Sequence, residues 1–154
     1  MELTKEFRFE ASHILPKHPG KCSRLHGHSW VLKVSVKGKV HPETGFVMDY
    51  AEISEVVKPI IDSLDHRHLG QWVSEEAQMR IPTDVFYSSL NKKVGTDHQV
   101  FWLSPEFYPS SENLLLAIAD RLTPDLNWSK LELNETCTSS AILTREEFDR
   151  YHRQ

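Results

Sequence analysis

The stretch His26-Gly-His-Ser-Trp-Val-Leu-Lys-Val-Ser-Val-Lys37 alternates between apolar and polar side chains for most of its length. Such alternation predicts a strand with one buried face, because successive side chains of a strand point to opposite sides. The apolar side chains that share this face are Trp30, Leu32, Val34 and Val36. His26 and His28 have the same parity, so the sequence places both imidazoles on the buried face, at the end of a packed layer.

A second alternating run precedes this stretch and ends in another histidine. One parity of residues 3–13 carries Leu3, Phe7, Phe9, Ala11 and His13. Two histidines on one face can share a metal ion, and a third ligand on a neighbouring strand would complete the set. Three neutral imidazoles leave one open position on a tetrahedral zinc, which is the pattern of a catalytic site. Cys22 lies just outside this set and is a candidate base or nucleophile, whereas the competing interpretation is three structural histidines at the edge of the core.

Further along the chain the periodicity changes from strand to helix. Asp49, with Glu52 three residues later, predicts the start of a helix that runs to Leu64. A second helix is expected from Pro109-Ser-Ser-Glu112 to Leu122, followed by two short strands around 131–135 and 141–143. The sequence Thr144-Arg-Glu-Glu147 predicts the cap of a short final helix.

The order of these elements predicts an α+β fold, with a four-stranded antiparallel sheet and two helices on one face. The lysine-bearing face of the second strand then needs solvent or a partner, such as the interior of an oligomeric barrel. Between about 70 and 108 the pattern is weak, with a possible helical turn at 75–80 and a possible strand at 99–103. The chain is therefore expected to be a single domain over 1–154 with an insertion at about 70–108.

Composition narrows the classes of function. The chain has 154 residues, of which 39% are hydrophobic and 26% charged, and a net charge of -4 gives no basic field for nucleic acid. No apolar run approaches the roughly 20 residues that cross a membrane, and MELTKEFRFE lacks the apolar core of a secretory signal. Only two cysteines occur, so we expect a cytoplasmic protein without a disulfide.

Six ordered segments carry a resemblance to a known family. They are Phe9-Glu-Ala-Ser-His-Ile-Leu15, Lys21-Cys-Ser-Arg-Leu-His-Gly-His-Ser29, Thr44-Gly-Phe-Val-Met-Asp-Tyr50, Leu64-Asp-His-Arg-His-Leu69, Pro109-Ser-Ser-Glu-Asn-Leu114 and Glu135-Thr-Cys-Thr138. Together they resemble the 6-pyruvoyltetrahydropterin synthase family, most closely its bacterial 6-carboxytetrahydropterin synthase branch of the queuosine pathway. The resemblance implies the tunnelling fold (T-fold). In that fold three subunits form a twelve-stranded antiparallel barrel, two trimers stack into a hexamer, and active sites lie at subunit interfaces.

The same resemblance implies roles for individual residues. His13, His26 and His28 would bind zinc, and Cys22 would transfer protons together with the pair Asp65 and His66. The pterin ring would be anchored by a carboxylate and by the start of a helix, through Glu135, Ser110, Ser111 and Glu112. Simpler interpretations remain open: Cys22 as a buried residue or a fourth zinc ligand, Asp65-His66 as an ordinary helix end, Glu135 as a surface residue, and Ser110 to Glu112 as a cap.

The implied activity is that of a zinc-dependent lyase. It would convert 7,8-dihydroneopterin triphosphate to 6-carboxy-5,6,7,8-tetrahydropterin, with release of acetaldehyde and triphosphate. The alternatives are triphosphate elimination to 6-pyruvoyltetrahydropterin, or a zinc- and pterin-binding oligomer without catalysis. A related branch that serves folate synthesis typically uses a glutamate in place of the cysteine, so Cys22 argues against it. The partners expected are a small pterin substrate and further copies of the chain, with no nucleic acid and no membrane.

The chain departs from the family pattern in two places. The segment after His66 is longer than in compact family members, which leaves the mouth of the site and the substrate preference open. The final strand reads Ser139-Ser-Ala-Ile-Leu143 where the closest relatives tend to have Gly and Tyr.

Overall fold

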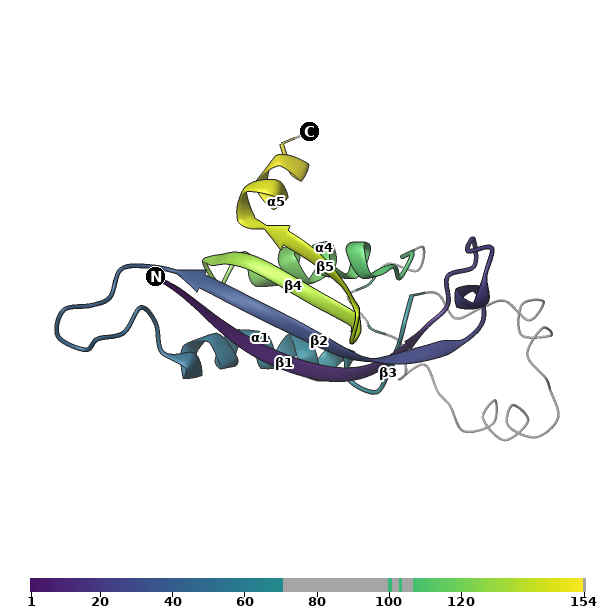
Figure 1. The fold of residues 1–154 in the computed structure, drawn as a ribbon, viewed down its shortest axis with the longest axis horizontal. Helices are drawn as coiled ribbons and strands as arrows, with labels where there is room; N and C mark the ends of the chain where they lie inside the picture. Colours follow the sequence, from purple (N-terminus) through teal and green to yellow (C-terminus); the bar gives the residue numbers. More distant parts are fainter. Residues whose placement is uncertain (71–99, 101–102, 104–106, 154) are drawn as a thin grey trace.

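The computed structural model describes residues 1–70, 100, 103 and 107–153 (Figure 1). Its strands are β1 (Glu2–His13), β2 (His26–Lys37), β3 (Arg67–Leu69), β4 (Trp128–Thr136) and β5 (Ser139–Thr144). Its helices are α1 (Tyr50–Leu64), α4 (Ser111–Leu122) and α5 (Arg145–Tyr151), with a short 3-10 turn, η1 (Lys21–Ser23), between β1 and β2. The helical turn expected at 75–80 and most of the strand expected at 99–103 lie outside the described residues.

The sheet has the strand order β3-β1-β2-β4-β5. Antiparallel pairs join β1 to β2, β2 to β4 and β4 to β5, as the order of the elements predicts. The expectation of a four-stranded, purely antiparallel sheet is wrong, because β3 adds a fifth strand parallel to the end of β1. β3 has only three residues, too few for a period of two to be recognised, and its partner strand lies more than 50 positions away.

The helices begin where the capping residues predict. Asp49 forms a full capping box with Glu52 at the start of α1, and Ser110 accepts a hydrogen bond from the backbone N–H of Asn113 at the start of α4. Thr144 and Glu147 form a second capping box, so the short final helix α5 is present and raises the number of described helices to three. Each box satisfies backbone N–H groups that have no partner inside the helix.

One face of the sheet carries the core. α1 contacts β1, α4 contacts β4 and β5, and the two helices contact each other, so both lie behind the same face in Figure 1. The two-helix layer expected from the sequence is thus present, and α5 packs on β4 and β5 through the buried ring of Phe148 against Trp128. The largest fully buried side chains include Phe9, Trp30, Leu32, Ile53, Leu64, Leu114, Ile118 and Leu133.

The opposite face is polar and is crossed by ion pairs between strands. Lys33 Nζ lies 2.9 Å from Glu132 Oε1, joining β2 to β4, and Lys130 Nζ lies 3.2 Å from Glu2 Oε1. The Thr4 and Ser35 hydroxyls are 2.8 Å apart on neighbouring strands. The lysine-bearing face is therefore internally paired. Among the described helices, none is long and apolar enough to cross a membrane.

Candidate metal centre

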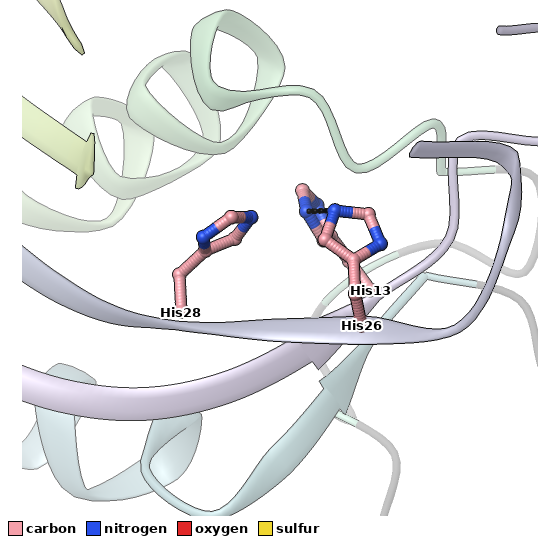
Figure 2. A group of neighbouring side chains, drawn as sticks. All are labelled: His13, His26 and His28. Atoms are coloured by element: carbon pink, nitrogen blue, oxygen red, sulfur yellow. Dashed lines mark hydrogen bonds between the residues drawn. The ribbon is translucent and has the colours of Figure 1, made fainter. Parts of the chain in front are cut away.

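Three imidazoles converge where β1 ends and β2 begins. Antiparallel pairing sets His13 directly opposite His26, and His28 follows two residues later on the same face of β2. The Nε2 atoms of His13 and His26 are 3.0 Å apart, and one ligand atom from each of the three rings lies within 4.8 Å of the others. Figure 2 shows the three side chains turned toward one another. The structure therefore brings together the three histidines that the sequence singled out, and they could hold a metal ion.

Two backbone carbonyls orient these rings. His13 Nδ1 lies 2.8 Å from the carbonyl oxygen of Pro109, and His26 Nδ1 lies 2.7 Å from that of Arg24. A carbonyl can only accept, so each Nδ1 carries the hydrogen and each neutral ring presents a bare Nε2. Two bare nitrogens 3.0 Å apart repel each other unless a cation lies between them. A hydrogen bond from the second ring nitrogen is also the usual way in which a protein orients a metal-binding histidine.

The surroundings of His13 and His28 favour the neutral forms of these two rings. The His13 side chain is 0% exposed and contacts the indole of Trp30 edge-on, with ring centroids 5.3 Å apart. Burial lowers the pKa of His13 to about 4, reinforced by its neighbour His26, although the hydrogen bond to Pro109 opposes the change. Burial also lowers the pKa of His28, against the opposing effect of Glu135. Neutral imidazole is the form that binds a metal ion, so the site is ready for one near neutral pH.

The donor set fits zinc and related divalent ions. Three imidazole nitrogens suit Zn²⁺, and a site with three protein ligands keeps a position for substrate. Within the described residues, the cluster of possible ligands consists of the three histidines and does not include Cys22. Cys22 lies in η1, is partly buried and forms no disulfide, and its carbonyl oxygen accepts a hydrogen bond from the backbone N–H of Leu15.

Glu135 reaches the same cluster from β4. Its Oε1 atom lies 3.3 Å from His13 Nε2 and 3.6 Å from His28 Nε2. It shares the parity of Leu131 and Leu133, as the sequence indicates, and it sits at a point where the register between β4 and β5 shifts. The carboxylate expected to meet the pterin thus stands beside the candidate metal site.

A cavity adjoins this carboxylate. Its volume is about 540 Å³, within the range of 300–1,000 Å³ that small-molecule sites usually have. Its lining combines His28 and Glu135 with residues of the polar face of the sheet, among them Glu6, Arg8 and Lys33, so the cavity lies mainly on the face opposite to His13 and His26. A side chain at Gly27 would place its Cβ 3.3 Å from the carbonyl oxygen of Ala11, so glycine allows the close approach of β1 and β2 between the two histidines.

Asp65 and His66 form a pair at the other edge of β1. Asp65 Oδ2 lies 2.8 Å from His66 Nδ1, while Asp65 Oδ1 accepts the backbone N–H of Glu10 at 2.7 Å. These bonds lower the pKa of Asp65, the one from the Glu10 backbone contributing most. The His66 side chain is 79% exposed, and its backbone has a positive φ of 57°. Glu10 has the parity opposite to His13, so the structure brings the pair together but not into the histidine cluster.

The start of α4 touches the site through its backbone. Ser110 caps the helix, and the Ser111 hydroxyl lies 3.4 Å from Glu112 Oε2. Pro109, immediately before the cap, supplies the carbonyl that holds His13. The capping interpretation of Ser110 therefore holds in this chain, alongside any contact that these residues make with a ligand.

Sequence reasoning missed the groups that orient the histidines. The carbonyls of Pro109 and Arg24 carry no signal in residue identity, because every residue has a carbonyl. It also missed the place of His68, which lies buried in β3 with its Nδ1 3.0 Å from the Ser12 hydroxyl. Its position two residues after His66 gave no sign that the two rings lie in different environments.

Known structures share this architecture. The structure of Caenorhabditis elegans 6-pyruvoyl tetrahydropterin synthase superposes with a TM-score of 0.67 at 21% identity, covering 94% of each chain. A curled mixed sheet backed by helices, with three imidazoles converging where two strands meet, defines a T-fold protein with a candidate metal site.

Sequence comparisons carry the assignment further. The family model described as 6-pyruvoyl tetrahydropterin synthase matches residues 2–146, so the chain belongs to that family. The 6-carboxy-5,6,7,8-tetrahydropterin synthase of Haemophilus influenzae is 31% identical over 144 residues, covering 90% of this chain and 94% of that protein. The 6-pyruvoyl tetrahydrobiopterin synthase of Dictyostelium discoideum is 38% identical over 84 residues, covering 47% of this chain and 60% of that protein.

Proposed function

We propose that this chain is a zinc-dependent carbon–carbon lyase of the queuosine pathway. It converts 7,8-dihydroneopterin triphosphate and one water molecule to 6-carboxy-5,6,7,8-tetrahydropterin, acetaldehyde and triphosphate. The observation that carries the proposal is the pair of bare Nε2 atoms on His13 and His26, held 3.0 Å apart by backbone carbonyls on their Nδ1 atoms. The name of the Haemophilus influenzae relative supports the choice of product.

Zinc would be held by His13, His26 and His28, and when bound it supplies Lewis acidity that lowers the pKa of the substrate's side-chain hydroxyls. The chain's own residues do the rest. Glu135 offers two carboxylate oxygens to the ring's 2-amino group and N3–H, an acceptor pair matched to a donor pair. The cavity of about 540 Å³ beside Glu135 has room for a bicyclic ring. His28 and Glu135 both line this cavity, so a ring held by Glu135 would lie beside the histidine cluster.

Proton transfer falls to Cys22 and to the pair of Asp65 and His66. The Cys22 thiol is expected to move a proton at the carbon atoms of the substrate side chain, since a positioned thiolate near a cation is a competent base. Asp65 holds the imidazole of His66 by its Nδ1, which leaves Nε2 free to exchange protons with substrate. Such pairing stabilises the charged imidazole during transfer.

We further propose that the working form is an oligomer, a hexamer built as a dimer of trimers. His66 is 79% exposed and its pair is anchored on the backbone of Glu10, away from the histidine cluster of the same chain. Contact with a neighbouring copy would give this exposed imidazole a substrate to act on. Sedimentation velocity tests the proposal, which predicts a species of six chain masses.

A second candidate function keeps the same residues but ends in 6-pyruvoyltetrahydropterin, by elimination of triphosphate without carbon–carbon cleavage. The name of the Dictyostelium relative favours it. A third is a zinc- and pterin-binding oligomer without turnover.

Mass spectrometry of the products distinguishes the three candidates, with zinc-loaded protein and 7,8-dihydroneopterin triphosphate as substrate. Carboxytetrahydropterin with acetaldehyde supports the lyase. Pyruvoyltetrahydropterin alone supports the eliminating enzyme, and unreacted substrate contradicts both enzymes.

A further inference from the structure

Glu135 stands closer to the candidate metal site than a pterin anchor requires. Its Oε1 atom lies 3.3 Å from His13 Nε2 and 3.6 Å from His28 Nε2. These two imidazoles are its recorded ion-pair partners among the described residues, and no lysine or arginine of that part of the chain pairs with it. A negatively charged carboxylate would gain little electrostatic stabilisation from neutral imidazole rings alone.

The groups around this point are all electron-pair donors. The hydrogen-bearing Nδ1 of His13 donates to the carbonyl oxygen of Pro109, so the lone pair of His13 Nε2 faces Glu135. Nε2 of His28 is buried and makes no hydrogen bond in the described part of the chain. A carboxylate oxygen and two imidazole nitrogens with no proton to share repel one another, and a cation among them reverses that repulsion.

Three of the separations in this cluster are close to those around a tetrahedral ion. With zinc–ligand bonds of about 2.0–2.1 Å, neighbouring ligand atoms of a tetrahedron lie about 3.3–3.4 Å apart. The observed separations of 3.0 Å between His13 and His26, 3.3 Å between His13 and Glu135, and 3.6 Å between His28 and Glu135 lie close to that value. Oε1 of Glu135 therefore stands at ligand spacing from two of the three imidazoles. In the described part of the chain, the group whose ligand atoms all lie within 4.8 Å of one another comprises the three histidines alone, so the carboxylate would turn toward His26 to become a fourth ligand.

We propose that Glu135 is an exchangeable fourth ligand of the metal. Without substrate, its carboxylate binds the metal together with the three histidines. When a pterin ring enters, its 2-amino group and N3–H draw the carboxylate away, and the fourth position opens for the substrate's side-chain oxygens. The pterin half of this exchange rests on the proposed function.

The local backbone suits such an exchange. The register between β4 and β5 shifts between Asn134 and Thr136, so Glu135 sits outside the regular ladder. Its side chain is 25% exposed and lines both the cavity and the histidine cluster. A carboxylate at this boundary can turn between the two without moving a strand. The metal would then be open to substrate only when a pterin is in place, which protects it from other ligands.

The first test measures metal affinity without any turnover. Zinc affinity is determined by competition with a chelator for the wild type and for Glu135→Gln, which is isosteric and neutral. We expect the variant to bind zinc about tenfold or more weakly, because even outer-shell partners change metal affinity by roughly 10–100-fold. Glu132→Gln is the matched control: it removes the same charge from β4, but at a residue that pairs with Lys33 on the opposite face.

The second test follows the exchange itself in cobalt-substituted protein. Addition of 6-methyl-7,8-dihydropterin, which has the ring donors but no side-chain hydroxyls, should shift the visible cobalt band of the wild type toward that of Glu135→Gln. Circular dichroism checks that the variants fold, and Glu135→Asp, whose carboxylate is one methylene shorter, serves if the glutamine variant does not. Equal zinc affinity in the wild type and in Glu135→Gln would overturn the proposal, as would pterin binding with an unchanged cobalt band.

Failure of the fourth-ligand proposal can be distinguished from failure of the proposed function. A protein that fails to turn over the triphosphate substrate but loses zinc affinity with Glu135 would contradict the lyase and support the fourth ligand. A protein that turns over substrate but has the same zinc affinity with and without Glu135 would support the lyase and contradict the fourth ligand.

Discussion

His13 Nδ1 donates a hydrogen bond to the carbonyl oxygen of Pro109, 96 positions further along the chain, over 2.8 Å. This bond joins the end of β1 to the segment that leads into α4, and it sets which nitrogen of His13 faces the candidate metal. Pro109 is in turn packed against Gly70, where an added Cβ would lie 3.0 Å from the proline ring and from the Phe107 carbonyl. Gly70 also has a φ of +90°, which a residue with a side chain rarely adopts.

We therefore expect Gly70→Ala to weaken metal binding from outside the ligand set. The new methyl group should displace Pro109, loosen its bond to His13 and lower zinc affinity several-fold. Backbone strain should also reduce the free energy of unfolding by about 1–3 kcal/mol. Zinc competition and urea denaturation of the metal-free protein measure the two effects.

Gly45→Ala is the matched control for this prediction. Gly45 also has a positive φ, of +74°, but nothing lies within 4 Å of its would-be Cβ. This variant should lose stability through strain and keep its zinc affinity. If both variants bound zinc like the wild type, the Pro109 contact would have no part in orienting His13.

These contacts show where sequence reasoning reaches its limit. The alternation around Trp30 and the parity of His26 and His28 place both rings on one face, since a strand has a period of two. His13 follows from the same rule on the neighbouring strand. The carbonyl of Pro109 and the three-residue strand β3 do not, because a backbone acceptor has no residue signature and a short parallel pairing leaves no periodicity.

Only part of the position of Glu135 could be predicted from the sequence. Its parity with Leu131 and Leu133 places it on the face of the histidines, and that much could be predicted from the sequence. Its approach to 3.3 Å from His13 depends on a register shift in β4, which arises from pairing between strands far apart in the chain.

Acid should destabilise the metal-free protein through His13. The folded protein holds the pKa of this ring at about 4, below the value of 6.5 expected when it is exposed in the unfolded chain. Between these values the unfolded chain binds the extra proton, so the free energy of unfolding falls as the pH falls. From pH 6.5 to 5, above the range of most carboxylates, we expect a loss of about 1.5 kcal/mol, measured by denaturant unfolding across the pH series.

A comparison of slopes isolates this effect. His13→Gln removes this titrating ring and should reduce the slope between pH 6.5 and 5, leaving the part that the lowered pKa of His28 contributes. His152→Gln should retain the wild-type slope, since His152 is half-exposed and pairs with Asp120 away from the cluster. A His13→Gln protein with the full wild-type slope would show that other groups cause the acid sensitivity.

Cys22 is expected to act on substrate and not on the metal. Among the described residues the possible ligand cluster contains the three histidines without Cys22, so Cys22→Ser should keep a full complement of zinc. Its turnover should fall by roughly 10²–10⁴-fold, the usual contribution of a positioned acid or base. Cys137→Ser, a change at the exposed second cysteine, should keep both zinc and turnover. Loss of zinc from Cys22→Ser would instead make the thiol a ligand.

The role of His66 can be separated from its backbone geometry. His66 has a φ of 57°, so His66→Gly removes the imidazole while placing the residue best suited to that conformation. The bond from its N–H to the Glu10 carbonyl, 2.6 Å long, belongs to the backbone and can persist. We expect the free energy of unfolding and the zinc content to stay near wild type, because the side chain is 79% exposed and touches Asp65 alone in the recorded contacts of the described chain. Turnover should fall by roughly 10²–10⁴-fold if the imidazole carries protons.

His66→Ala, which removes the same ring but keeps a Cβ in the left-handed region, should match the glycine variant in turnover and be less stable by about 1 kcal/mol. Turnover near wild type in both variants would exclude His66 from the reaction.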